Sequence, residues 1–197
     1  FLHSPAGYAA LARGLAGAAS ALLDRGADLA VRLAQDTHPR AFFLASRPFV
    51  AGAHEAHLKV QEMSGGRIIA KAEDTLGFRH GFMAAVDGDS LIVLHLSGDG
   101  YRRRYELDLL AELEAKGLGR TTVVVADSAE GARGELLEYG VHAAVTDQFR
   151  APLAMLPGQL LGLFVSLRLG LKPDNPSPAG VINRVVRGVR IHPYGRR

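Results

Sequence analysis

Cysteine and tryptophan are absent from this 197-residue chain, and methionine occurs three times. The lack of cysteine excludes a disulfide framework and thiolate chemistry, and it fits a cytoplasmic protein. Basic residues are also too scattered to form a nucleic-acid footprint: Arg102-Arg103-Arg104 and Arg196-Arg197 are short, and the net charge is only +3. We interpret these short arginine runs as solvated surface and expect no nucleic-acid partner.

Long apolar runs are absent as well. No uninterrupted apolar stretch reaches the roughly 18 residues that a bilayer-spanning helix needs, and no signal-peptide pattern is present, so we expect no membrane partner. Hydrophobic residues make up 48% of the chain and charged residues 22%, which is ordinary for a globular protein. A chain of this length can bury a substantial core as one domain.

Strand-like and helix-like segments alternate through the middle of the chain. Short apolar runs that are typical of buried strands lie at residues 41–46, 67–70, 91–96, 121–126 and 141–145. Helical patterns lie at residues 51–64, 103–116, 130–139 and 158–169. This alternation predicts an α/β fold, a three-layer sandwich in which helices cover both faces of a parallel sheet.

The two ends of the chain depart from this alternation. Residues 1–40 are rich in Ala and Leu and predict two leading helices that are separated at Gly26. Residues 171–197 form a tail that contains too much proline for a helix or a central strand. We therefore predict a single domain over residues 1–197, with its α/β core at residues 41–170.

Three charged residues of the first helix after a strand lie at positions i, i+4 and i+7. These residues are Glu55, Lys59 and Glu62, and this spacing places them on one helix face. The preceding strand ends where open α/β sheets have their ligand-binding crevice, and an exposed segment at residues 78–81 follows. The pattern indicates a polar site, although solvated helix faces commonly show the same spacing.

Other candidate residues admit a structural interpretation beside a functional one. His54 and His57 have a spacing that can bind a metal, but no third ligand is evident, and we expect surface or interface residues. His95 lies within a predicted strand and is expected to be a hydrogen-bonded core histidine. Residues 97–100 form either a phosphate-binding loop or a tight turn, and the aspartate within them favours the turn.

Three segments together resemble a sugar isomerase (SIS) domain: residues 44–62, 77–87 and 101–113. The tail segments at residues 173–177 and 183–186 narrow the resemblance to the tagatose-6-phosphate ketose/aldose isomerase and galactosamine-6-phosphate deaminase/isomerase group. The resemblance extends over nearly the whole chain, but it corresponds only to the C-terminal half of such a protein, which carries two SIS domains in tandem.

The resemblance implies a five-stranded parallel sheet of flavodoxin-like order. It also implies an aldose–ketose isomerase or amino-sugar-phosphate deaminase that acts on a hexose or hexosamine 6-phosphate without a cofactor. Glu62 matches the base that transfers a proton between C1 and C2. His80 matches a histidine that assists opening of the sugar ring and is contributed across a subunit interface. Ser46, Glu55 and Lys59 are expected to contact the substrate.

This chain departs from the family pattern in two loops. Arg47 stands where the family has glycine, and Phe82-Met83 replaces a Pro-Lys pair. These departures favour a rival interpretation, a non-catalytic phosphosugar-binding or regulatory SIS module, whereas the retained Glu62 and His80 favour the enzyme. A purely structural dimerisation domain is the third alternative. The expected protein partner is an upstream SIS half or a second subunit, most simply in a homodimer.

Overall fold

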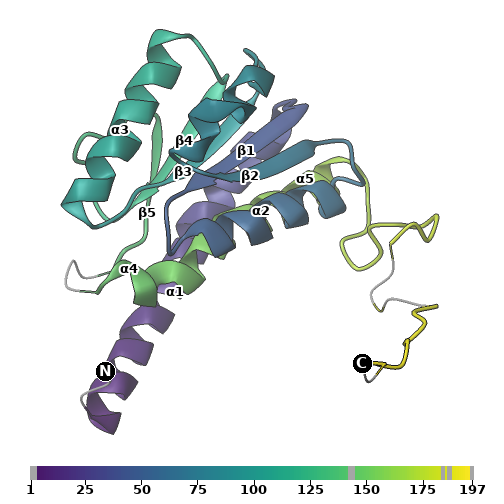
Figure 1. Cartoon of the computed structure of the whole chain (residues 1–197), viewed down its shortest axis with the longest axis horizontal. Coiled ribbons are helices and arrows are strands. Elements are labelled where there is room, and N and C mark those ends of the chain that lie inside the picture. Colours follow the sequence, from purple (N-terminus) through teal and green to yellow (C-terminus); the bar gives the residue numbers. More distant parts are fainter. Residues whose placement is uncertain (1–3, 142–144, 183–184, 186–187, 196–197) are drawn as a thin grey trace.

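The computed structural model describes residues 4–141, 145–182, 185 and 188–195, which form a five-stranded parallel sheet with helices on both faces (Figure 1). The strands are β1 (Arg40–Ala45), β2 (Ile69–Asp74), β3 (Leu91–His95), β4 (Thr121–Ala126) and β5 (Glu135–Glu138). Their order is β2-β1-β3-β4-β5, and every neighbouring pair is parallel. This topology confirms the predicted α/β sandwich of flavodoxin-like order.

The helices divide unequally between the two faces of the sheet (Figure 1). The long helices are α1 (Pro5–Gln35), α2 (Val50–Met63), α3 (Gly100–Ala115) and α5 (Leu156–Arg168). The short helices are η1 (Gly77–His80), η2 (Phe82–Ala85), α4 (Asp147–Arg150) and η3 (Ala151–Met155). Helix α3 covers one face, while α5 packs between α1 and α2 on the other.

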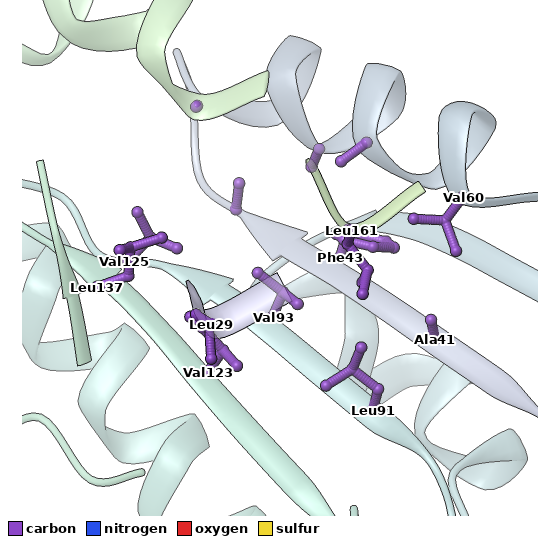
Figure 2. Close-up of a cluster of buried hydrophobic side chains, with 14 of the residues drawn as sticks. Leu29, Ala41, Phe43, Val60, Leu91, Val93, Val123, Val125, Leu137 and Leu161 are labelled. Carbon is purple, nitrogen blue, oxygen red and sulfur yellow. The ribbon is translucent and has the colours of Figure 1, made fainter. Parts of the chain in front are cut away.

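Alternate residues of the central strands supply two separate cores. Phe43, Val93 and Val123 point toward α1, α2 and α5, in the cluster that Figure 2 shows. Phe42 and Leu94 point the opposite way, toward α3. Because successive side chains of a strand alternate between faces, a sheet covered on both faces requires continuous apolar runs. This requirement explains why β1, β3 and β4 were recognisable from sequence.

The predicted helix break at Gly26 is wrong, because α1 is continuous from Pro5 to Gln35. A Cβ atom at Gly26 would lie 2.9 Å from Leu160 Cδ1 of α5. The glycine therefore allows close approach of two helices rather than ending one of them.

The helix predicted at residues 130–139 is also wrong, since this segment contains β5. Gly131 and Gly134 have φ angles of 71° and 107°, which interrupt a helix. A Cβ at Gly134 would meet the Thr122 carbonyl oxygen at 2.4 Å, so glycine permits the approach to β4. The strand predicted at residues 141–145 lies largely outside the described residues.

Two helical segments of the described chain are long and apolar enough to cross a membrane: α1 and residues Asp147–Arg168. Neither segment is an uninterrupted apolar run, which is why the sequence pattern did not predict them. Length and composition are the only basis of this finding, and a core helix of a globular protein passes the same test. Helix α5 has such a core position, because Leu161 and Val165 are buried between the neighbouring helices and the sheet.

Candidate active site

Helix α2 brings Glu55, Lys59 and Glu62 together on one partly exposed face, as predicted from their spacing. Lys59 Nζ donates a hydrogen bond of 2.7 Å to Glu62 Oε2. This bond raises the pKa of Lys59, against a smaller effect of burial, and the charge of Glu55 acts in the same direction. Glu55 Oε1 accepts a bond of 3.1 Å from Gln159 Nε2 of α5. The face is therefore an ordered polar array.

The proline-rich tail folds back beside the end of α2 and encloses two hollows with it. One hollow has a volume of about 460 Å³ and is lined by Glu62, Arg67 and tail residues 176–179. The other measures about 500 Å³ and is lined by Lys59, Glu62 and tail residues 173–177. These volumes lie in the range of small-molecule sites. Glu62 lines both hollows, so its carboxylate lies where a ligand could reach it.

The sequence suggested that the polar face opens at the carboxyl edge of the sheet. The structure places it elsewhere. Helix α2 runs from the carboxyl end of β1 back to the amino end of β2, and its 14 residues rise roughly 21 Å. Glu62 lies in its last turn, at the amino edge of the sheet. Ser46 follows β1 directly and lies at the opposite, carboxyl edge. The structure of one chain therefore does not bring Ser46 and Glu62 together.

His80 ends the short helix η1, beyond the carboxyl end of β2. The six residues of β2 span roughly 20 Å, so His80 and Glu62 lie toward opposite edges of the sheet. His80 is exposed, and its imidazole makes no hydrogen bond or ion pair with another described residue. Phe78, which was expected to be exposed, is fully buried and packs edge-on against Phe42 at 5.5 Å.

Residues 97–100 form a tight turn that caps α3. Asp99 accepts hydrogen bonds from the backbone amides of Tyr101 (3.1 Å) and Arg102 (3.0 Å). The amide of Ser97 donates to Glu106 Oε2 at 2.7 Å, and burial raises the pKa of Glu106. This arrangement corresponds to the turn that the sequence favoured over a phosphate loop.

A carboxylate of the chain itself occupies the space beside this turn. Asp147 accepts hydrogen bonds from Ser97 Oγ at 2.5 Å and from the Gly98 amide at 3.0 Å. Arg150 Nη2 approaches Asp147 Oδ1 at 2.5 Å, and its Nη1 lies 3.0 Å from Asp127 Oδ2. Asp147 and Arg150 are almost completely buried. Many α/β domains bind an external anion at this end of a strand. At the end of β3 the side chains of Asp147 and Arg150 occupy that position.

The histidines at positions 54 and 57 lie on α2, and His95 lies in β3. The rings of His54 and His57 lie 5.5 Å apart, and burial, followed by the charge of His54, lowers the pKa of His57. Among the described residues, no group of three or more His, Cys, Asp or Glu side chains could hold a metal ion. His95 Nδ1 hydrogen-bonds with Tyr139 Oη at 2.7 Å, and burial lowers the pKa of His95 to about 4. The prediction of a hydrogen-bonded core histidine is confirmed.

Sequence reasoning missed the tail as part of the Glu62 surroundings. Ser177 and Ile182 line the hollows although they lie more than 110 residues after Glu62 in the sequence. It also missed Asp147 and Arg67, which follows the end of α2 by four residues and lines one of the hollows. No local periodicity connects such distant positions; a pairing of this kind is decided by packing.

Comparison with known proteins finds relatives of one kind, although no family model matches the chain. The D-galactosamine-6-phosphate deaminase AgaS of Escherichia coli O157:H7 is 35% identical over 161 residues, which cover 79% of this chain and 41% of that protein. The enzyme of the same name from Shewanella sp. (strain ANA-3) is 32% identical over 173 residues, covering 88% and 42%. The chain spans less than half the length of these relatives.

Solved structures agree with this result. The tagatose-6-phosphate ketose/aldose isomerase of Escherichia coli superimposes with a TM-score of 0.79 at 30% identity, covering 92% of this chain and 47% of that one. The C-terminal domain of glucosamine-fructose-6-phosphate aminotransferase from Francisella tularensis shares the fold, with a TM-score of 0.66 at 24% identity.

The fold and these relatives define a sugar isomerase (SIS) domain of the phosphosugar type. Within that family, the chain belongs to the group of the AgaS deaminases and tagatose-6-phosphate ketose/aldose isomerases, and it corresponds to about half of such a protein.

Proposed function

We propose that this chain is one half of a sugar-phosphate isomerase or amino-sugar-phosphate deaminase and that it supplies the catalytic base, Glu62. The observation that carries the proposal is the position of Glu62, which is paired with Lys59 and lines both hollows between α2 and the tail. The relatives are named for activity on galactosamine 6-phosphate and tagatose 6-phosphate. A hexose or hexosamine 6-phosphate is accordingly the proposed substrate class.

The chemistry needs one group that accepts a proton from one sugar carbon and returns it to the adjacent carbon. The Glu62 carboxylate would take the C2 proton of the open-chain aldose, which leaves an enediolate, and would return the proton to C1 while the hydroxyl proton of O2 passes to O1, which forms the ketose. Lys59 holds Oε2 and orients the carboxylate, so that Oε1 can face the substrate. Such general acid–base catalysis typically contributes roughly 10²–10⁴-fold in rate.

The proposed role of His80 is opening of the sugar ring, because a neutral imidazole can accept and donate protons near neutral pH. Within one chain His80 lies far from Glu62, so the His80 that serves a given Glu62 would come from a second copy. The phosphate of the substrate would be held by the upstream SIS half. A homodimer of such complete chains, located in the cytoplasm, stays a prediction.

The test is solvent hydrogen exchange at C2 of the substrate by the complete protein, followed by NMR in D₂O. Glu62→Gln is expected to abolish exchange, since the amide cannot accept the proton. Glu114→Gln in α3, which removes only an exposed ion pair with Arg133, serves as the control and should retain exchange. Undiminished exchange in the Glu62→Gln variant would contradict the assignment.

One observation favours a second candidate function, a non-catalytic phosphosugar-binding module. The carboxyl edge of this sheet, where α/β domains commonly bind ligands, is filled by Asp147 and Arg150 and is flanked by the exposed Arg47. Such a module would bind a sugar phosphate in the complete protein without exchanging its C2 hydrogen, so the same experiment separates the two functions.

A further inference from the structure

We propose that Arg79 and Glu112 are positioning residues that hold the η1–η2 loop on α3 and thereby orient the His80 imidazole outward. The inference rests on the proposed role of His80 in ring opening. We refer to residues 78, 79, 82, 83, 112 and 116 and their contacts as the His80 clamp.

The side of the clamp that precedes His80 is attached at two consecutive residues. Phe78 is fully buried in the core beneath α3 and packs edge-on against Phe42. Arg79 Nε lies 2.6 Å from Glu112 Oε2 of α3, and both side chains are partly exposed. A charge-assisted bond of this length is stronger and more directional than a neutral one. The backbone is therefore anchored immediately before His80.

The side of the clamp that follows His80 is attached to the same helix. Lys116 Nζ lies 2.6 Å from Glu112 Oε1 and 3.7 Å from Met83 Sδ. Glu112 thus binds a cation with each of its oxygens, and Lys116, followed by Arg79, lowers its pKa. The Glu112 carboxylate of α3 is therefore connected to the loop on both sides of His80. It binds Arg79 before His80, and it binds Lys116, which contacts Met83 after His80.

Two further contacts restrain the second half of the loop. The Lys71 ammonium lies 4.4 Å from the ring centroid of Phe82, within the range of a cation–π interaction. Arg40 Nη1 donates a hydrogen bond of 3.0 Å to the carbonyl oxygen of Ala85 at the end of η2. Phe82 and Met83 are the residues at which this loop departs from the family pattern, and each of them makes one of the restraining contacts.

His80 itself is the exception within this restrained loop. Residues on both sides are anchored, yet His80 is exposed and its imidazole has no hydrogen bond or ion pair with the described chain. A side chain that packs for stability would be expected to find a partner. A free imidazole on a fixed backbone is suited to meet a group outside its own chain, since catalytic geometry tolerates little displacement.

The experiment uses the complete protein with Arg79→Gln and Glu112→Gln. Loosening the loop is expected to lower kcat for the cyclic substrate by about 10–100-fold with little change in KM. Turnover of an open-chain substrate, which needs no ring opening, should be nearly unchanged. The exchanged pair Arg79→Glu/Glu112→Arg should recover part of the loss. The matched control is Glu114→Gln, which removes an exposed ion pair with Arg133 from the same helix and should have no effect.

The outcomes separate this inference from the proposed function. If His80→Asn leaves turnover of the cyclic substrate intact, the ring-opening role fails. If His80→Asn impairs turnover whereas Arg79→Gln and Glu112→Gln do not, the positioning role alone is overturned. An equal loss on cyclic and open-chain substrates would show that the clamp serves folding instead. Relaxation of the ¹³C-labelled His80 imidazole gives an independent readout, because loosening of the loop should increase its fast motion.

Discussion

Two carboxylates of this chain illustrate how environment decides the role of a residue. Asp147 is almost fully buried and is surrounded by the Ser97 hydroxyl, the Gly98 amide and the Arg150 guanidinium. Glu62 has about a third of its side chain exposed and makes a single ion pair with Lys59. A buried, fully bonded carboxylate contributes to the architecture, whereas a half-exposed one that lines a hollow is available for proton transfer.

Asp147→Asn is expected to destabilise the protein by about 3 kcal/mol, because it leaves the buried Arg150 without one of its two anionic partners. Chemical denaturation at neutral pH measures the change. Asp89→Asn is the control: its ion pair with Arg120 is exposed, and such pairs contribute at most about 1 kcal/mol. Equal denaturation midpoints for the two variants would contradict a structural role for Asp147.

His95 predicts a specific loss of stability in acid. Its pKa is about 4 in the folded protein and 6.5 ordinarily, so between these values the unfolded chain takes up the proton. Above pH 6.5 His95 makes its full contribution to the free energy of unfolding. This contribution, about 3 kcal/mol, is lost as the pH falls toward 4. Denaturation of wild type and His95→Gln at pH 7 and pH 4.5 tests this, and the variant should show a smaller change.

This comparison with the variant is needed because other groups titrate in the same interval. Burial raises the pKa of Glu106, so its folded form holds the proton more tightly and its contribution has the opposite sign. The difference between wild type and variant isolates His95. An identical pH dependence in both proteins would disprove the assignment.

At the scale of elements, the Glu62 face depends on how closely α5 packs against α2. A Cβ at Gly158 would lie 2.2 Å from Ala56 Cβ, and one at Gly52 would lie 2.6 Å from Ala154 Cβ. Gly158 of α5 therefore meets α2 at backbone distance, and Gly52 of α2 meets Ala154 of η3 in the same way. The hydrogen bond between Gln159 and Glu55 extends this contact to the polar face. Separating the helices should disturb both stability and the site.

Gly158→Ala is expected to cost about 1–3 kcal/mol, because overpacking forces the two helices apart. It should also lower C2 exchange, since α2 carries Glu62. Gly14→Ala in α1 is the matched control: a Cβ there meets no atom within 4 Å, and alanine is a better helix former than glycine by about 1 kcal/mol. Chemical denaturation of both variants measures the change in stability, and the C2-exchange assay measures the change in activity. A destabilised Gly14→Ala or an unaffected Gly158→Ala would refute the packing argument.

At the scale of the molecule, the two proposed catalytic residues lie toward opposite edges of one sheet. If both residues serve one site, as proposed, the His80 that meets a given Glu62 would come from a second copy, and closed two-fold dimers are the commonest such assembly. The first turns of α1 extend beyond the sheet with exposed apolar residues such as Tyr8 (Figure 1). An exposed surface of this kind is typical of an interface.

Sharing of sites predicts complementation between two inactive variants. In a mixed dimer of Glu62→Gln and His80→Asn chains, one site combines both mutations and the other combines the intact Glu62 and His80. Random mixing should therefore restore about a quarter of the wild-type activity. Activity of the co-expressed complete proteins, with tags that isolate the mixed dimer, measures this. Failure of an isolated mixed dimer to recover activity would mean that each site uses residues of one chain.

The amino-acid sequence by itself determined the features that depend on local periodicity. Strands β1, β3 and β4 were predicted within one residue at each end, because burial on both faces demands continuous apolar runs. The grouping of Glu55, Lys59 and Glu62 followed from the geometry of a helix. The local pattern was misleading at glycines. It predicted the end of a helix at Gly26, where the structure shows close packing of two helices, and it predicted a helix in the glycine-containing segment that leads into β5.

Only the tertiary structure decided which distant residues meet. The tail lies against Glu62, Asp147 fills the turn after β3, and Glu112 anchors the loop of His80. These partners are separated by about 30 to more than 110 residues in the sequence. Their contacts arise from the packing of whole elements, which a pattern of three or four neighbouring residues does not encode. The same packing places Glu62 and His80 toward opposite edges of the sheet, so the proposed site would draw these two residues from different chains.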